Sequence, residues 1–248
     1  MSDRAARSRS FESVAAEYER HRPEYPEEAL RWAAEQFGLE PASRVLDVGA
    51  GTGKLTRGLV ALGLGVVAVE PGGPMLEQLR EAVPEAEALE APAESIPLPD
   101  ASVDAAFAGQ AFHWFDPARA LPELHRVIAP GAGGLALLWN WWDERDPLQH
   151  ELGPLVGYAG HWPFRNDELP GAPWFREQGR TVVESTEESS PESLVAHLAT
   201  TSMFVTMEPD ERERRLAEAR AIAARYGERF PLPRLTYVFA FARVGGGR

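Results

Sequence analysis

A glycine-rich heptapeptide at residues 47–53 constrains the fold of this chain more than any other feature. It contains Gly49, Gly51 and Gly53, and the apolar run at residues 44–48 that leads into it is typical of a buried strand. A helical pattern begins immediately afterwards. Glycines between a strand and a helix turn the chain tightly and let a ligand approach the backbone N–H groups. The sequence therefore predicts a nucleotide-type site at the carboxyl end of a strand.

Strand and helix patterns alternate on both sides of this loop. Further strands are predicted at 66–70, 86–90, 103–108, 135–139, 181–185 and 235–244, and helices at 27–37, 54–62, 74–82, 117–128, 191–204 and 209–226. The alternation predicts an α/β fold, a Rossmann-like doubly wound sheet with helices on both faces. We expect seven strands, the last of them antiparallel.

The chain is expected to form one domain with elaborations. Residues 1–40 form an N-terminal helical lid, residues 41–140 the cofactor-binding core, and residues 141–248 the C-terminal part of the same domain, with substrate-selecting helices and the last strands. After Asn140 the pattern becomes irregular, which predicts helix and loop around four tryptophans: Trp141, Trp142, Trp162 and Trp174. The acidic run at 184–188 is interpreted as a solvated strand end.

Composition excludes several classes of function. The net charge of -13 and the lack of a basic run disfavour a nucleic-acid partner. No segment is apolar enough to span a bilayer or to serve as a signal peptide, which predicts no membrane partner and a cytoplasmic location. Cysteine is absent, so disulfides and thiolate chemistry are excluded.

Glu70 at the end of the next predicted strand supports the nucleotide interpretation, because a carboxylate there can accept hydrogen bonds from ribose hydroxyls. A dinucleotide-binding loop requires glycine three positions after Gly51, and Lys54 occupies that position. An NAD(P)-dependent oxidoreductase therefore stays open as an alternative but fits less well.

The motif from Asp47 to Gly53 resembles the first motif of the class I S-adenosylmethionine-dependent methyltransferase superfamily, and the resemblance extends over about residues 10–140. It implies S-adenosylmethionine as cofactor and S-adenosylhomocysteine as product. By position, the implied cofactor site contains Asp47, Gly49, Ala50, Gly51, Thr52, Glu70, Pro71, Met75, Ala93, Glu94, Gln110 and Ala111, joined by Tyr18 and Arg22 from the lid. An ordinary packing residue of its helix is an equal alternative for Met75.

The segment at 93–104 resembles the next motifs of the superfamily, whose first part normally contacts the adenine edge. Pro92 stands where many members have an aspartate, so the resemblance implies that Glu94 or a backbone carbonyl accepts from the adenine amino group instead. Asp104 is interpreted as a capping or solvated residue rather than part of the site.

The segment at 110–116 follows the fourth predicted strand and therefore borders the reaction centre. Its Gln-Ala-Phe-His-Trp-Phe sequence resembles a signature of a small-molecule branch that includes trans-aconitate methyltransferase. His113 is a candidate proton acceptor, or else a hydrogen-bonded histidine in the pocket floor. Trp114 is a candidate for cation–π contact with the sulfonium, or else part of the pocket wall.

The segment at 18–26 resembles the lead that precedes the core in the same branch. In a lid, Tyr18 would cover the methionine end of the cofactor, as a candidate catalytic as well as binding residue, and Arg22 would contact a carboxylate. The alternative is a surface helix end whose Arg22 pairs with Glu24.

The later helices are expected to select the acceptor. Their apolar residues favour helix core over a pocket lining: Leu198, Met203, Phe204 and Val205. His150, His161 and His197 have no metal-ligand spacing, so no metal site is predicted. The sequence thus predicts a methyltransferase acting on an O, N or C atom of a small molecule, with the acceptor and oligomeric state open. A cofactor-binding module without turnover remains the alternative from another class.

Overall fold

The computed structural model describes residues 19–131, 133–157 and 173–245. The chain divides into two compact units. The core unit comprises Glu24–Asn140, Asn166–Val183 and Thr236–Arg248, and the helical unit comprises Met1–Pro23, Trp141–Arg165 and Glu184–Leu235. The two units are taken in turn below.

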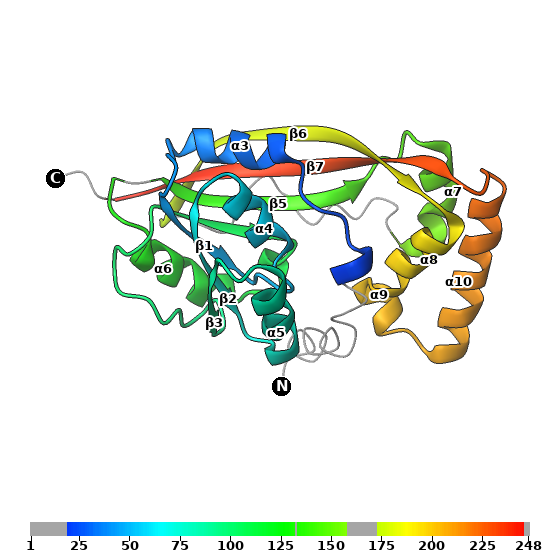
Figure 1. The fold of residues 1–248 in the computed structure, drawn as a ribbon, viewed down its shortest axis with the longest axis horizontal. Helices are drawn as coiled ribbons and strands as arrows, with labels where there is room; N and C mark the ends of the chain where they lie inside the picture. The colour runs from blue at the N-terminus through cyan, green and yellow to red at the C-terminus, as the bar shows by residue number, and fades with distance from the viewer. Residues whose placement is uncertain (1–18, 132, 158–172, 246–248) are drawn as a thin grey trace. The chain divides into compact units, whose positions relative to one another are not determined.

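One seven-stranded sheet in the order β3-β2-β1-β4-β5-β7-β6 organises the core unit (Figure 1). Its strands are β1 (Arg44–Val48), β2 (Gly65–Glu70), β3 (Glu87–Glu90), β4 (Ala105–Gly109), β5 (Gly134–Trp142), β6 (Phe175–Ser189) and β7 (Phe230–Arg243). The first five are parallel, with Leu46 of β1 aligned with Val67 of β2 and with Ala106 of β4. The predicted doubly wound α/β fold is confirmed.

The last strand runs antiparallel to its neighbour β5. Gly134, at the start of β5, lies against the backbone of Phe241 near the end of β7, whereas Asn140 near the end of β5 binds Thr236 further back along β7. Residue numbers therefore rise along β5 while those of their partners on β7 fall, and this order defines antiparallel pairing. This confirms the expected antiparallel strand.

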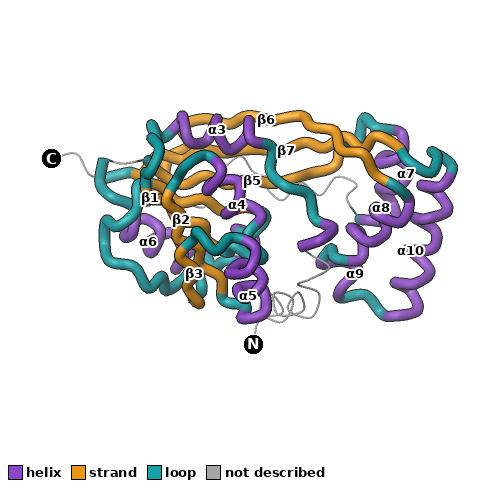
Figure 2. Tube along the Cα trace, viewed as in Figure 1, coloured by secondary structure: helices purple, strands orange, loops and turns teal. Residues whose placement is uncertain are grey.

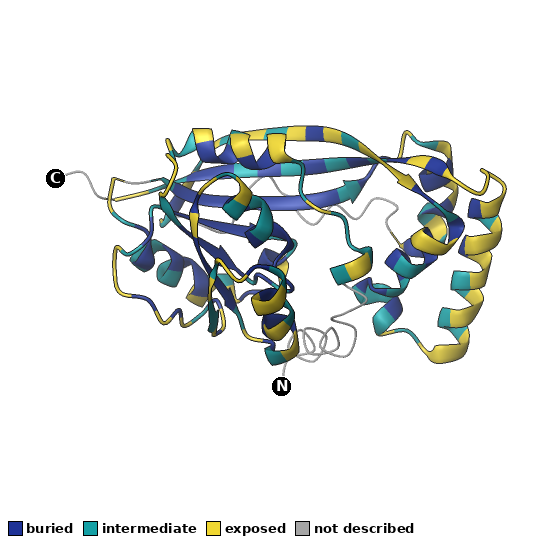
Figure 3. Ribbon diagram, viewed as in Figure 1, coloured by how far each residue is buried: buried dark blue, intermediate teal, exposed yellow. Residues whose placement is uncertain are grey.

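Helices cover both faces of the sheet because β1 to β3 and β4 to β5 extend it in opposite directions with right-handed crossovers. The helices α3 (Glu27–Gln36), α4 (Lys54–Ala61) and α5 (Gly73–Ala82) lie on one face, and α6 (Pro117–Val127) lies on the other (Figure 1). The central strands are buried on both sides (Figure 3).

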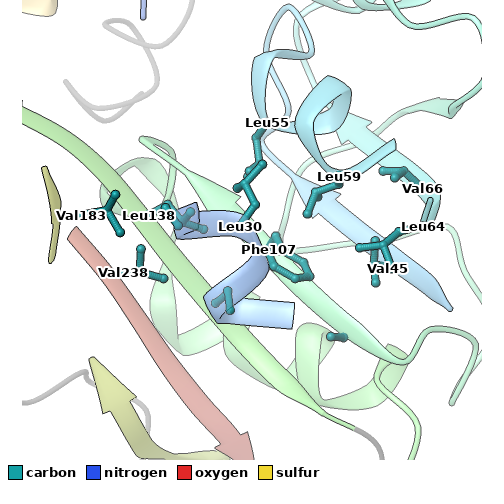
Figure 4. Close-up of a cluster of buried hydrophobic side chains, with 14 residues drawn as sticks. Leu30, Val45, Leu55, Leu59, Leu64, Val66, Phe107, Leu138, Val183 and Val238 are labelled. Atoms are coloured by element: carbon teal, nitrogen blue, oxygen red, sulfur yellow. The ribbon is translucent and has the colours of Figure 1, made fainter. Parts of the chain in front are cut away.

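A single apolar cluster joins the first helices to the sheet (Figure 4). Leu30 of α3 and Leu59 of α4 meet Phe107 of β4, and all three side chains are almost fully buried. Burying side chains of this size contributes roughly 1.5–3 kcal/mol each. This cluster fixes the strands whose carboxyl ends carry the predicted site.

The helical unit contains α7 (Pro147–Val156), α8 (Pro191–Ala199), α9 (Ser202–Val205) and α10 (Pro209–Ala224), together with the adjoining ends of β5, β6 and β7. Leu198 and Phe204 are fully buried in its apolar cluster, and Met203 packs against them. For these three residues the structure confirms helix core rather than a pocket lining.

The predicted helix at 191–204 is interrupted in the structure. It ends at Ala199 because the hydroxyl groups of Thr200 and Thr201 donate to the carbonyls of His197 and Leu198 one turn back. Such local hydrogen bonds compete with continuation of the helix. A separate short helix, α9, then begins at Ser202.

The predictions for the later strands were wrong in extent. Trp141 and Trp142, expected in irregular structure, continue β5, since aromatic side chains suit a strand. Trp174 lies in a turn, and Trp162 is outside the described residues. β6 is much longer than the apolar pattern indicated, because exposed charged and polar residues alternate along it. β7 begins five residues earlier than expected, in a segment that contains Pro231 and Pro233.

The acidic run on β6 is a solvated strand end, as expected, and its exposed glutamates have arginine partners. Glu184, Glu187 and Glu188 pair with Arg145, Arg234 and Arg229, all within the helical unit. Among the described residues, no helix is long and apolar enough to cross a membrane.

Candidate functional site

The glycine loop adopts a backbone conformation that its glycines make possible. Gly49, Gly51 and Gly53 have φ values of 69°, 58° and 92°, in the left-handed region that side chains rarely adopt. A Cβ on Gly49 would lie 2.6 Å from the Cβ of Ala111, so the loop packs directly against the segment after β4. A Cβ on Gly51 would meet nothing within 4 Å. The loop is therefore closely packed at its first glycine and open at its second.

Glu70 links this loop to the turn after β2. One carboxylate oxygen accepts a hydrogen bond from the backbone N–H of Gly51 and the other accepts from that of Gly72, each at 2.9 Å. The side chain is thus held at the carboxyl edge of the sheet. Each carboxylate oxygen can accept more than one hydrogen bond, so the same group can also receive hydroxyl donors.

Asp47 lies fully buried beneath the loop. Its Oδ2 accepts from the Thr56 hydroxyl at 2.6 Å, whereas its Oδ1 has no hydrogen-bond partner among the described residues. Burial raises the pKa of Asp47 to about 7, and the nearby charge of Glu70 adds to the increase, while the Thr56 hydrogen bond opposes it. The Thr52 hydroxyl is also buried without a partner in the described part of the chain.

Asp47 Oδ1 and the Thr52 hydroxyl oxygen, both buried beside the glycine loop, have no hydrogen-bond partners among the residues that the structure describes. Buried polar groups are nearly always hydrogen-bonded in folded proteins. A cationic or hydroxyl-bearing ligand beside the loop would satisfy them, and it would also stabilise the charged form of Asp47. The residues present therefore fit a cofactor that carries an ammonium group and ribose hydroxyls.

Four further residues of the predicted cofactor site lie in the core unit and differ in how far they are buried. Ala50 packs in a small cluster with Leu79 of α5, and Met75 lies on the buried face of that helix. Pro71 is exposed in the turn between β2 and α5, next to Glu70. Ala93 is buried in the connection that follows β3.

The segment after β4 begins with a strained residue. Gln110 has a φ of 55°, although it is not glycine. Its backbone N–H donates to the carbonyl of Leu138, and its side-chain amide donates to the carbonyl of Asn140 at 2.8 Å. Residues in such conformations cost energy and cluster at functional sites.

His113 and Trp114 follow in a short 3-10 helix (Phe112–Trp114). His113 is exposed and Trp114 is half-buried, with their ring centroids 4.6 Å apart. Ala111 and Phe115, on either side, pack against Gly49 and so connect this segment to the glycine loop.

Asn140 at the end of β5 is a hub that the sequence did not reveal. Its amide nitrogen donates to the carbonyl of Glu24, its amide oxygen accepts from the Thr236 hydroxyl, and its backbone carbonyl accepts from Gln110. The side chain of Asn140 is buried, and its bond with Thr236 is buried as well. A lone asparagine at a strand end carries no motif that would have indicated this role.

Glu24 forms a second connection to the loop. Its carboxylate accepts from the ammonium of Lys54 at 2.8 Å and from the guanidinium of Arg57 at 2.7 Å. Lys54 is the residue that occupies the position of the third dinucleotide-loop glycine, and only 8% of it is exposed. Pairing of Arg22 with Glu24, the alternative to a lid, is therefore wrong.

Of the two predicted lid residues, the structure describes Arg22. Arg22 belongs to the helical unit, where its guanidinium donates to the hydroxyl and the carbonyl of Thr200. Tyr18 lies outside the described residues. Also in the helical unit, His197 is buried and bonds to the carbonyl of His21; burial, with Arg234 and Arg22 nearby, lowers its pKa well below the usual value.

The connection between β3 and β4 contains Glu94, whose carboxylate accepts from the backbone N–H of Asp116 at 2.6 Å. Asp104, at the far end of this connection, accepts from the backbone N–H of Arg44 at the amino end of β1. It therefore lies at the opposite edge of the sheet from the glycine loop. No group of metal-ligating side chains occurs in the described parts of the chain, and His161 lies outside them.

Comparison with known proteins agrees with this geometry. Residues 46–136 match a family model described as a methyltransferase domain. An uncharacterized methyltransferase of Mycobacterium tuberculosis is 46% identical over 219 residues, which cover 88% of this chain and 86% of the relative. An uncharacterized methyltransferase of Schizosaccharomyces pombe is 33% identical over 216 residues, or 85% of each chain.

A solved structure gives the same assignment. The structure assigned as a type II methyltransferase from Anaeromyxobacter dehalogenans is similar with a TM-score of 0.66 and 32% identity, over 90% of this chain and 97% of that one. These relatives favour methyl transfer over the oxidoreductase alternative. Together with the glycine loop and Glu70, they show that this chain belongs to the class I S-adenosylmethionine-dependent methyltransferase superfamily.

Proposed function

We propose that this enzyme binds S-adenosylmethionine at the glycine loop and transfers its methyl group in line to a small-molecule acceptor. The single observation that carries the proposal is the placement of Glu70, whose carboxylate is fixed between Gly51 and Gly72 at the open part of the loop. A carboxylate at this position is suited to a ribose.

Each part of the loop has a separate task in this proposal. The carboxylate of Glu70 accepts from the ribose hydroxyls, and the backbone of Gly49 and Gly51 lies against the amino-acid part of the cofactor. Asp47 and Thr52 supply the two buried oxygens that lack partners. Ala93 and Glu94 lie along the adenine edge, where Pro92 offers no acceptor side chain.

The cofactor supplies a methyl group bonded to a positively charged sulfur, which leaves as a neutral thioether. The protein then has to align the acceptor and exclude water, and few catalytic side chains are needed. Gln110 and Ala111 form the floor of the proposed pocket beside the glycine loop. His113, exposed at this edge, is placed to take the proton that an oxygen or nitrogen acceptor loses.

The acceptor is proposed to be a small molecule selected by the helical unit together with Arg22 and the lid. The net charge of -13 disfavours a polyanionic acceptor such as nucleic acid. The chemical identity of the acceptor atom does not follow from the loop, which contacts only the cofactor.

Isothermal titration calorimetry with S-adenosylhomocysteine tests the cofactor assignment. We expect binding of S-adenosylhomocysteine to the wild type and at least tenfold weaker binding to Glu70→Ala, with no measurable binding of NAD to either. Tight NAD binding without affinity for S-adenosylhomocysteine would overturn the proposal. A metabolite extract incubated with enzyme and methyl-labelled cofactor then tests turnover, and binding without labelled product from any extract would favour the cofactor-binding module without turnover.

A further inference from the structure

The connection between β3 and β4 is an ordered loop where a doubly wound fold usually has a crossover helix. It runs from Ala91 to Asp104 and contains no helix (Figure 2). Parallel strands are normally joined by a helix that packs on the sheet. Loops of this length without secondary structure are uncommon in compact domains and are usually functional or disordered. Something other than helix packing must therefore hold this loop in one conformation.

Arg126, in the last turn of α6, supplies three of the hydrogen bonds that do so. Its guanidinium donates to the carbonyl of Leu98 at 2.7 Å, to the carbonyl of Ile96 at 2.9 Å and to the carboxylate of Asp100 at 2.8 Å. Its two remaining donors go to the carboxylate of Glu123, one turn earlier on the same helix. All five N–H donors of the guanidinium are used.

Glu123 completes the arrangement because it binds both the arginine and the loop. Its carboxylate also accepts from the backbone N–H of Ile96 at 3.0 Å. The pairing lowers the pKa of Glu123 and raises that of Arg126, so both groups are charged throughout the physiological range. The backbone carbonyl of Arg126 accepts from the N–H of Ala101, which adds a further bond between the helix and the loop.

The same helix holds the loop at its other end. Glu94 accepts from the backbone N–H of Asp116, the residue that caps the start of α6. The loop is thus attached to α6 at both ends of the helix, through Glu94 at the start and through Arg126 at the end. Ala93 and Glu94 are the residues placed at the adenine edge by the proposed function.

We propose that Arg126 is a positioning residue that sets the adenine edge of the cofactor site, by fixing the loop that carries Ala93 and Glu94. The inference rests on the proposed function. Arg126 itself does not touch the cofactor. Without the three hydrogen bonds from the Arg126 side chain, the loop would retain its attachments through Glu94 and through the backbone N–H of Ala101 but would sample other conformations, and recognition of the base would weaken.

Arg126→Met tests this role because it keeps the aliphatic stem and removes every donor. Arg119→Met, on the same helix but exposed, is the matched control. Hydrogen–deuterium exchange without ligand should be faster at residues 95–101 in Arg126→Met and unchanged in Arg119→Met. Asp100→Asn removes the charge of an exposed partner and should have little effect, whereas Arg126→Lys should be intermediate.

Base discrimination separates positioning from a general loss of structure. The affinities for S-adenosylhomocysteine and S-inosylhomocysteine, which differ at the amino group of the base, are measured for each folded variant. We expect the wild type to prefer S-adenosylhomocysteine and Arg126→Met to lose at least tenfold of its affinity together with most of that preference. Glu94→Gln should lose the preference in the same way, without faster exchange at residues 95–101.

Two results would overturn the inference. One is an Arg126→Met variant that matches Arg119→Met in exchange and in affinity. The other is an equal loss of affinity for both ligands, which a merely structural role would give. Failure of the wild type to bind S-adenosylhomocysteine would instead overturn the proposed function, and this inference with it.

Discussion

The side-chain amide of Gln110 donates to the backbone carbonyl of Asn140, 2.8 Å away, and so joins the carboxyl ends of β4 and β5. Gln110 has a positive φ, so this bond helps to hold a backbone conformation that costs energy. The side-chain amide of Asn140 is in turn hydrogen-bonded to the carbonyl of Glu24 and the hydroxyl of Thr236. The segment that carries His113 therefore begins at a residue fixed by three other parts of the chain.

Removing the hydroxyl of Thr236 should show how much this hub stabilises the core unit. Thr236→Val preserves shape but leaves the buried amide oxygen of Asn140 without its donor, which typically costs about 1–3 kcal/mol. Thr236→Ser restores the hydroxyl and should recover most of the loss. Urea denaturation measures both variants, and equal stability of Thr236→Val and the wild type would contradict a structural role for the hub.

Three glycines in and near the loop should respond differently to alanine. Gly49→Ala should be strongly destabilising, because its Cβ would lie 2.6 Å from that of Ala111 in addition to the positive φ. Gly51→Ala meets no neighbour within 4 Å, so it should cost only the backbone strain, about 1–2 kcal/mol, while weakening S-adenosylhomocysteine binding. Gly73→Ala, with neither constraint, is the control. Thermal denaturation and calorimetry distinguish the three.

Asp47 predicts a pH dependence of stability with a defined sign. Its folded-state pKa of about 7 lies above the ordinary aspartate value of 3.8, so between these pH values the folded state binds more protons than the unfolded state. The contribution to stability is present at low pH and is lost as pH rises to about 7, by up to about 1.4 kcal/mol per pH unit. Asp47→Asn should remove this slope, which is measured as the difference between variant and wild-type unfolding free energies from pH 4 to 8. A difference that does not vary with pH would contradict the raised pKa.

His197 should act in the opposite direction in the helical unit. Because its folded-state pKa is lowered, the unfolded state takes up a proton first, and stability falls as pH drops below about 6.5. His197→Gln cannot be protonated and should flatten this part of the curve. His150→Gln, on an exposed part of α7, is the matched control and should leave the curve unchanged.

His113 can be tested once an acceptor has been identified. His113→Ala should lower turnover by about 100-fold or more if the imidazole takes the proton of the acceptor, with little change in the affinity for S-adenosylhomocysteine. His113→Gln distinguishes proton transfer from hydrogen bonding, because it retains a donor and an acceptor but no basic group. An unchanged rate in both variants would assign His113 a purely structural role.

The sequence predicted those parts of the molecule where spacing alone determines structure. The hydrophobic period and the turn residues agree around Gly49–Gly53, so the strand, loop and helix there were identified. Glu70 was identified from its position at the end of the next strand. The length of β6 was missed because charged and polar residues fill most of the strand. The first residues of β7 were missed because they include Pro231 and Pro233, which are uncommon within strands. Arg126 and Asn140 were missed for a different reason: their roles arise from partners that are distant in sequence, such as Ile96 and Thr236.

The position of β7 between β5 and β6 also determines when the core unit can be completed during synthesis. The ribosome makes β6 before β7, yet among the described strands β6 pairs only with β7, so its first residues emerge with no edge to join. Until residues 236–243 have been translated, β5 is left as an exposed sheet edge, which is a template for aggregation. We therefore expect nascent chains that stop before Thr236 to depend on chaperones.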